Sequence, residues 1–153
     1  MRVGIGYDMH RLRVGRELVI GGVRIDHPAG LEGHSDADVL THAVIDALLG
    51  AAGLGDIGKL FPAGDPKFKN ASSLDLLATT VRTVLAAGYR IVNVDSTVIA
   101  EEPRLGPHLR AMEANLAKHL GTEDVNVKAT SPEGLGALGK KTGIAAQAIA
   151  LIE

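Results

Sequence analysis

The strongest constraint on the fold is a change in the spacing of apolar residues between the first ten residues and the segment that begins at Ser35. Residues 1–9 alternate, with large side chains on one side and Gly4, Gly6 and Asp8 on the other, which predicts a strand. From Ser35 the spacing becomes helical, and Ser35 with Asp38 resembles a capping box. The apolar face of this predicted helix consists of Val39, Leu40, Ala43, Val44, Ala47, Leu48 and Ala51. The first third of the chain therefore combines a strand with a long apolar helix.

The rest of the chain mixes the same two kinds of element. Strands are expected at residues 18–20, 23–25, 89–100, 125–130 and 144–152, with Gly21-Gly22 as a two-residue hairpin turn. Helices are expected from Ser72 to Gly88, with Leu74, Leu77, Val81, Val84 and Leu85 facing inward, and from Pro107 to Gly121. Glycine-rich loops are expected at residues 50–55 and 131–143. Because no repeat or linker divides the chain, we expect one compact α+β domain over residues 1–153.

Composition narrows the possible functions. The 16 Lys and Arg residues against 18 Asp and Glu give a net charge of −2, and no basic run is present, which argues against a nucleic-acid partner. The absence of cysteine excludes disulfides, thiolate catalysis and cysteine-ligated metals, so any transition metal must be held by histidine and carboxylate. No segment is long and apolar enough for a membrane span, and residues 1–15 do not resemble a signal peptide. We therefore expect a cytoplasmic protein, or a plastid one whose transit peptide has been removed.

Two glycine patterns imitate nucleotide-binding motifs without meeting their requirements. Gly53 to Lys59 nearly matches a phosphate-binding P-loop, but Leu60 stands where a magnesium-binding hydroxyl is needed. Gly134 to Gly139 fits the dinucleotide fingerprint by letter only, because too little chain follows it for a βαβ unit. A turn-rich loop explains both patterns more simply.

Three residues have the spacing of a metal site. Asp8 and His10 are two apart on the predicted strand, so their side chains leave the same face, and His42 lies on the helix expected to pack near them. One carboxylate and two imidazoles suit an open zinc site. Asp38 and Asp46, four residues on either side of His42, are candidates to orient its ring. At this stage a solvated strand end and an ordinary helix cap remain alternative explanations.

Several long motifs resemble the 2-C-methyl-D-erythritol 2,4-cyclodiphosphate synthase family. The helix segment reads Ser35-Asp-Ala-Asp-Val-Leu-Thr-His42-Ala-Val-Ile-Asp-Ala-Leu48, and the chain opens with Arg2-Val-Gly-Ile-Gly-Tyr-Asp8-Met-His10. Leu54-Gly-Asp-Ile-Gly-Lys-Leu-Phe-Pro62 and Asp124-Val-Asn-Val-Lys-Ala-Thr130 are also similar to the family's motifs. The resemblance runs in order along essentially the whole chain.

The resemblance implies a fold, an assembly and a reaction. The fold would be a mixed β-sheet with helices packed on one face, assembled as a homotrimer with active sites between subunits. The substrate would be a small cytidine diphosphate compound, 4-diphosphocytidyl-2-C-methyl-D-erythritol 2-phosphate. Its 2-phosphate would attack its own β-phosphorus, giving the 2,4-cyclodiphosphate and CMP in non-mevalonate isoprenoid synthesis. Such a step requires positioning and charge stabilisation rather than a protein nucleophile. No nucleic acid or membrane would take part.

The resemblance also implies roles for individual residues. Asp8, His10 and His42 would bind one Zn²⁺ per active site, and Glu133 would help bind Mg²⁺ or Mn²⁺. His34 and Ser131 would stabilise the pentavalent phosphorus and so act catalytically. The implied substrate-binding residues are Asp8, Met9, His10, His34, Ser35, Asp56, Ile57, Gly58, Phe61, Asp65, Ala100, Pro103, Arg104, Leu105, Gly106, Thr130, Ser131 and Glu133.

The chain departs from the family pattern at a few positions. Ala63-Gly64 replaces a common Asp-Thr pair, so only Asp65 of that motif is carried over. Pro132 stands where a hydroxyl residue is common, and it has no N–H to offer a phosphate. Arg104 stands where lysine is frequent. Ala137 and Lys140 replace residues that often line the trimer's central cavity, so isoprenoid-diphosphate binding there is not implied.

Two other functions remain open from the sequence. One is a metal-dependent phosphohydrolase acting on nucleoside diphosphate derivatives, in which solvent oxygen would enter the product. The other is a non-catalytic trimer that binds cytidine nucleotides without turning them over.

Overall fold

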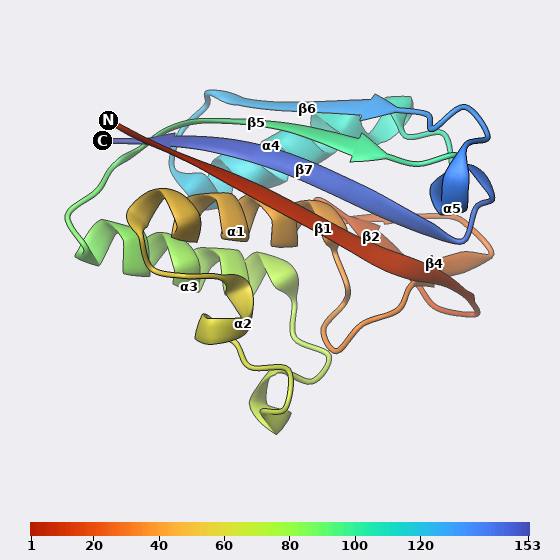
Figure 1. Ribbon diagram of the computed structural model, residues 1–153, viewed down its shortest axis with the longest axis horizontal. Helices are drawn as coiled ribbons and strands as arrows, with labels where there is room; N and C mark the ends of the chain where they lie inside the picture. The colour runs from red at the N-terminus through yellow and green to blue at the C-terminus, as the bar shows by residue number, and fades with distance from the viewer.

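A five-stranded mixed sheet and the helices on one of its faces form the body of the molecule (Figure 1). The computed structural model describes all 153 residues. The elements are β1 (Arg2–Val14), β2 (Leu18–Ile20), β3 (Val23–Ile25), β4 (Ala29–Leu31), α1 (Val39–Ala52), α2 (Ile57–Leu60), the 3₁₀ turn η1 (Pro66–Phe68), α3 (Ser73–Ala86), β5 (Ile91–Ile99), the 3₁₀ turn η2 (Gly106–His108), α4 (Leu109–Leu120), β6 (Val125–Thr130), α5 (Gly136–Gly139) and β7 (Gly143–Ile152). The predicted α+β fold with a mixed sheet is confirmed. No helix is long and apolar enough to cross a membrane.

The sheet has the order β4-β1-β7-β5-β6, and β2 pairs with β3 in a separate hairpin. The long strand β1 pairs antiparallel with β7 from Arg2↔Ile152 to Arg11↔Gly143. On its other side β7 pairs antiparallel with β5, and β5 pairs parallel with β6. The two ends of the chain therefore lie side by side, at one end of neighbouring strands (Figure 1).

The glycines of β1 let helix α1 lie directly on the strand. A Cβ atom at Gly6 would stand 1.9 Å from the carbonyl oxygen of Ala43, and one at Gly4 would stand 2.0 Å from that of Ala47. No side chain fits in so narrow a gap, which explains why glycine alternates with larger residues here. This close approach holds the first turns of α1 beside the middle of β1, where the metal-site candidates lie.

The larger residues of β1 face away from the helices. Val3, Ile5, Tyr7 and Met9 are each more than half exposed, although the apolar core elsewhere is continuous. Ile149 of β7 is 46% exposed as well. An apolar sheet face left open to this extent marks an interaction surface.

Helix α1 begins later than the sequence pattern suggested. Its N-cap is Asp38, whose side chain accepts from the backbone N–H of Thr41, and its C-cap is Gly53 in the left-handed region. The predicted capping box at Ser35 is therefore wrong, because the Ser35 hydroxyl instead accepts from Ala37 N–H in the turn before the helix. Nearly all of α1 is buried, because the sheet covers one side of the helix and α3 covers another. The helix is therefore more buried than the one apolar face predicted from the sequence.

The other predicted helices and strands are confirmed with local differences, and α1 continues through Gly50 to Ala52, where a loop was expected. The hairpin at Gly21-Gly22, the strand β6 and the strand β7 lie where expected, and α3 follows its N-cap Ser72. Leu85 is 52% exposed rather than inward, because it points away from the face that carries Leu77 and Val84. The short elements β4, α2 and α5 were not predicted, since segments of three or four residues carry too little periodicity.

Candidate metal centre and active site

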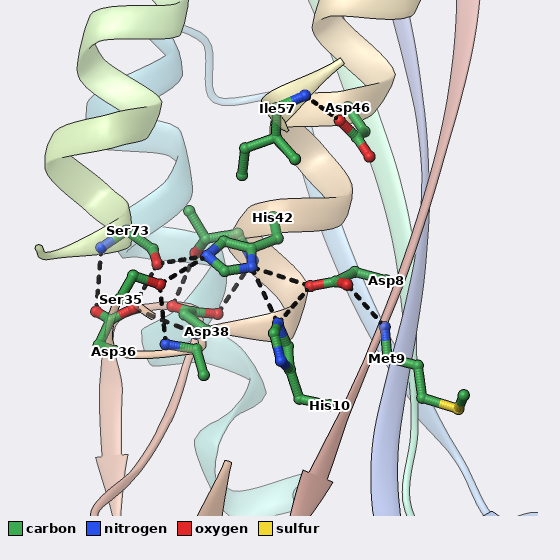
Figure 2. A network of polar contacts seen from close by, with 12 residues as sticks. Asp8, Met9, His10, Ser35, Asp36, Asp38, His42, Asp46, Ile57 and Ser73 are labelled. Atoms are coloured by element: carbon green, nitrogen blue, oxygen red, sulfur yellow. Dashed lines mark hydrogen bonds and ion pairs between the residues drawn. The ribbon is translucent and has the colours of Figure 1, made fainter. Parts of the chain in front are cut away.

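Asp8, His10 and His42 converge on one point between β1 and α1 (Figure 2). The Asp8 Oδ2 atom lies 2.8 Å from His10 Nε2 and 2.9 Å from His42 Nδ1. The two imidazole nitrogens are 3.2 Å apart. The predicted cluster is therefore assembled by the fold, with all three side chains half-buried or buried.

The second nitrogen of each imidazole is held by a fixed partner. His10 Nδ1 lies 2.8 Å from the carbonyl oxygen of Glu32, which can only accept, so the ring proton sits on Nδ1. Nε2, the nitrogen that faces Asp8 and His42, is then the one available to a metal. This arrangement orients a metal-binding histidine through the nitrogen that does not bind the metal.

The electrostatics of the cluster favour an ionised aspartate. Burial raises the pKa of the Asp8 carboxyl, but hydrogen bonds and attraction from His10 and His42 outweigh burial and hold the pKa below its usual range. For His10, burial lowers the pKa, while the hydrogen bond and charge of Asp8 raise it by more, so the net shift is upward. A carboxylate surrounded by imidazoles is already in the form that binds a cation.

The donor set fits a divalent metal. One carboxylate oxygen and two imidazole nitrogens, all within 4.8 Å of one another, provide three ligands and leave a fourth position open to a small molecule. Because cysteine is absent, the soft sulfur sites are excluded, and the mixed oxygen and nitrogen set suits zinc and its neighbours in the first transition series.

A cavity of about 260 Å³ opens beside the three residues. Of the residues expected to bind substrate, Asp8, His10, His34, Ser35, Ile57, Gly58 and Phe61 line it. Ala63, Phe68 and Leu76 complete the wall and make it partly apolar. The cavity therefore brings the first group of predicted site residues together.

Three other predicted residues do not line this cavity. Asp56 is the N-cap of α2 and accepts from Lys59 N–H, and Asp65 caps the turn η1 by accepting from Lys67 N–H. The Met9 side chain faces the exposed side of the sheet, and its backbone N–H donates to Asp8 Oδ1 at 2.9 Å. Met9 therefore supports the cluster through its backbone.

The second group of predicted residues surrounds a different cavity, of about 480 Å³. It is lined by Ala100, Pro103, Arg104, Leu105, Gly106, Thr130 and Ser131, together with neighbouring residues. Glu101 accepts from the Ser131 hydroxyl and from Gly134 N–H, which holds the loop after β6 against the loop after β5. Glu133 lies in this loop, is exposed, and takes a positive φ of 54°. Within one chain Glu133 is not part of the Asp8 cluster.

Two aspartates have different roles from those predicted. Asp38 does not contact the His42 ring; it accepts from Gly21 N–H, Gly22 N–H and Thr41, and so ties the β2–β3 hairpin to α1. Asp46 accepts from Ile57 N–H at 2.7 Å and positions α2 (Figure 2). Helical spacing puts both aspartates on the same face of α1 as His42. Their carboxylate oxygens, however, accept hydrogen bonds from backbone N–H groups of other segments.

Two hydroxyl groups whose contact with His42 the sequence did not predict lie beside the outer nitrogen of its ring. Its Nε2 atom lies 2.9 Å from the Ser73 hydroxyl and 3.2 Å from the Ser35 hydroxyl. The Ser73 hydroxyl in turn donates to Asp36. Ser73 is 31 residues from His42, so no local spacing could indicate this contact.

Comparison with known proteins identifies the family. The sequence profile of the YgbB family matches residues 1–153. The chain belongs to the YgbB family. Curated relatives similar to it are called 2-C-methyl-D-erythritol 2,4-cyclodiphosphate synthase. The protein of Syntrophomonas wolfei is 57% identical over all of this chain and 99% of its own length. That of Desulfatibacillum aliphaticivorans is 58% identical over the full length of both chains.

Solved structures of similar proteins have the same fold. A 2C-methyl-D-erythritol-2,4-cyclodiphosphate synthase matches with a TM-score of 0.91 at 36% identity, covering 99% of this chain and all of that one. A structure of a synthase of the same name in a CDP-bound form matches equally well. The bifunctional IspDF of Campylobacter jejuni matches with a TM-score of 0.95 at 43% identity. This chain spans 42% of that longer protein.

Proposed function

We propose that this chain converts 4-diphosphocytidyl-2-C-methyl-D-erythritol 2-phosphate to 2-C-methyl-D-erythritol 2,4-cyclodiphosphate and CMP. The observation that carries the proposal is the Asp8, His10 and His42 cluster at the mouth of a cavity. It occurs in a chain that matches proteins named for this synthase along its full length. The enzyme is a phosphorus–oxygen lyase of isoprenoid biosynthesis.

The reaction joins two phosphates of one molecule. An oxygen of the 2-phosphate forms a bond to the β-phosphorus, and the bond from that phosphorus to the oxygen bridging to the α-phosphate breaks. CMP leaves with the electron pair of the broken bond. Because the substrate provides its own nucleophile, the protein must fold the substrate and offset the crowded negative charge. The absence of cysteine is compatible with such a mechanism.

The metal proposed for the cluster is Zn²⁺, held by Asp8, His10 and His42. When bound, it would supply Lewis-acid polarisation of a phosphate oxygen. Glu133 would contribute an oxygen ligand to a second ion, Mg²⁺ or Mn²⁺. The exposure of Glu133 in the loop after β6 leaves its carboxylate accessible to such an ion.

The chain's own residues bind and orient the substrate. His34 at the cavity wall and Ser131 in the loop after β6 would donate to the phosphate oxygens of the transition state. Gly58 in the cavity and Asp56 beside it would hold the methylerythritol hydroxyls. The cavity around residues 100–106 would accept the cytosine, where backbone N–H and C=O groups can read the edge of the base.

A homotrimer with intersubunit active sites belongs to the same proposal. Two features support it. The residues expected to bind the two halves of the substrate line separate cavities within one chain, and the apolar face of β1 is exposed. Burying that face against neighbouring chains removes apolar surface from water, and it allows one chain's metal cluster to meet another chain's nucleotide cavity.

Turnover in water enriched in heavy oxygen tests the proposed reaction against hydrolysis. Intramolecular attack leaves the label out of both the cyclic product and CMP, because each oxygen comes from the substrate. Incorporation of the label into an open-chain product would contradict the proposal and identify a phosphohydrolase. Binding of CDP with no turnover in the presence of both metals would instead indicate a nucleotide-binding trimer.

A further inference from the structure

A chain of three polar groups, two of them buried and the last half-buried, runs outward from the metal cluster (Figure 2). The first is the Nε2 atom of His42, and the second is the hydroxyl of Ser73, 2.9 Å away at the start of α3. The third is the carboxylate of Asp36, which accepts from that hydroxyl. Ser73 is fully buried and His42 is 9% exposed, so water does not readily replace these contacts.

The direction of each hydrogen bond follows from the carboxylate at the end of the chain. Both Asp36 oxygens already accept from backbone N–H groups, and the single hydroxyl hydrogen of Ser73 also points to Asp36. The Ser73 oxygen is then left to accept from His42, which places the ring proton on Nε2. With the proton on Nε2, the Nδ1 lone pair is available to a metal held between Nδ1 and Asp8.

We infer that Ser73 and Asp36 are positioning residues that set the tautomer and ring orientation of His42 for metal binding. The inference rests on the proposed function in that it takes Asp8, His10 and His42 as the metal ligands. It extends that function to two residues that contact neither the metal nor the cavity of the three ligands.

Asp36 also has a structural duty that the test must separate from this role. Its two carboxylate oxygens accept from Ser73 N–H at 3.1 Å and from Asp38 N–H at 3.2 Å. The same carboxylate thus connects the beginnings of α1 and α3. A loss of activity alone would not distinguish a misplaced helix from a misoriented imidazole.

The first test measures zinc affinity, by competition with a chromophoric chelator. Ser73→Ala removes the nearer of the two hydroxyls that face His42 Nε2 and leaves the Ser35 hydroxyl at 3.2 Å. We expect zinc affinity to fall about 10- to 100-fold. The matched control is Thr80→Ala, which removes another buried hydroxyl of α3, one that donates to the Leu76 carbonyl far from the metal ligands. It should keep wild-type affinity. Unchanged affinity in Ser73→Ala would overturn the inference.

The second test reverses the hydrogen bonds without removing any heavy atom. In Asp36→Asn the amide NH₂ faces a backbone N–H in either orientation, because both Asp36 oxygens accept from the backbone. Where the NH₂ group takes the place of Oδ1, it donates to the Ser73 hydroxyl. The hydroxyl hydrogen must then turn toward Nε2 of His42, which favours the ring proton on Nδ1. We expect zinc affinity to fall by about 10-fold or more. The facing N–H groups also lower the zinc-free thermal midpoint, so the affinity is compared with that of Thr80→Ala, which loses a buried hydroxyl of α3 that does not contact His42. Wild-type affinity in this variant would contradict the inference.

Nitrogen-15 NMR of the wild-type imidazoles provides a test that needs no variant to fold. In the zinc-loaded protein, we expect Nδ1 of His42 to bind the metal and Nε2 to carry the ring proton. Metal binding through Nε2, with the proton on Nδ1, would overturn the inference. None of these readouts depends on turnover, so an inactive wild-type protein with normal zinc affinity and this tautomer would refute the proposed reaction and leave the positioning role intact.

Discussion

At the scale of single residues, His42 has the most demanding position in the molecule. Its Nδ1 faces Asp8 and His10, while its Nε2 is enclosed by the hydroxyls of Ser73 and Ser35. Both ring nitrogens therefore have assigned partners, and the ring cannot rotate without breaking contacts on both sides. The cluster depends on this one helical side chain to complete its three ligands.

Replacing His42 by alanine tests the ligand set directly. We expect His42→Ala to lose zinc during gel filtration and to lose turnover by about 100-fold or more, because two ligands hold the ion weakly and leave the phosphate charge unbalanced. Metal analysis and CMP release are the measurements. His119→Ala is the control, since His119 is a half-buried helical histidine whose ring contacts only the Asn115 carbonyl. A His42→Ala protein that retained zinc and activity would refute the assignment.

The sequence predicted the three residues of this cluster but not the groups that support them. Asp8 and His10 share a strand face by simple alternation, and His42 lies on a helix that local periodicity identifies. Ser73 contacts His42 because α3 packs on α1, and Asp36 acts on His42 only through Ser73. Local sequence patterns do not predict contacts between segments that are far apart in the chain. Asp46 lies on the helix as predicted, but it does not orient His42. Its carboxylate instead accepts a hydrogen bond from Ile57 N–H.

At the scale of elements, the close packing of α1 on β1 decides the geometry of the cluster. Gly6 lies two residues before Asp8, and the backbone of α1 approaches it at Ala43, next to His42. The helix and strand are therefore held together at the level of the metal ligands. The alternation of glycine was visible in the sequence, but its meaning, a helix in backbone contact, required the structure.

Gly6→Ala tests this packing. The added methyl would lie 1.9 Å from the Ala43 carbonyl oxygen, so α1 must shift. We expect a loss of about 3 kcal/mol or more in the free energy of unfolding, measured by denaturant titration, together with weaker zinc binding. Gly64→Ala, where a methyl meets nothing within 4 Å, should leave both unchanged. Equal behaviour of the two variants would show that β1 and α1 are not in backbone contact.

A second element-scale prediction concerns the start of α1. Asp38 is fully buried, and its carboxylate accepts from Gly21 N–H, Gly22 N–H and Thr41. Asp38→Ala removes the cap and leaves buried backbone donors of the hairpin without acceptors. We expect the free energy of unfolding to fall by about 2–4 kcal/mol. Asp75→Ala, at an exposed position in the first turn of α3, serves as the control. Equal stability of the two variants would contradict the role assigned to Asp38.

At the scale of the whole molecule, the exposed face of β1 and β7 is the feature that the single chain leaves unexplained. Val3, Ile5, Tyr7, Met9 and Ile149 present apolar side chains to solvent on the side opposite the helices. The sequence predicted that β1 has two different faces, but it did not predict which face the helices cover. Helix α1 packs on the face that carries Gly4 and Gly6.

The trimer proposal predicts how a charge on this face changes the assembly. Ile5→Lys, at a position 62% exposed in the single chain, should convert a trimer to a monomer in sedimentation and abolish turnover, because a buried unpaired charge opposes association. Leu85→Lys places the same charge at a similarly exposed apolar position on α3 and should remain trimeric. A wild-type protein that sediments as a monomer at every concentration would contradict intersubunit active sites.

Phosphorus NMR of the reaction tests the central claim most directly. The purified protein is supplied with Zn²⁺, Mg²⁺ and 4-diphosphocytidyl-2-C-methyl-D-erythritol 2-phosphate, and spectra are followed over time. The account predicts the appearance of CMP together with a coupled pair of signals from the cyclic diphosphate. CMP accompanied by an open-chain bisphosphate, or a substrate spectrum that does not change with both metals bound, would contradict it.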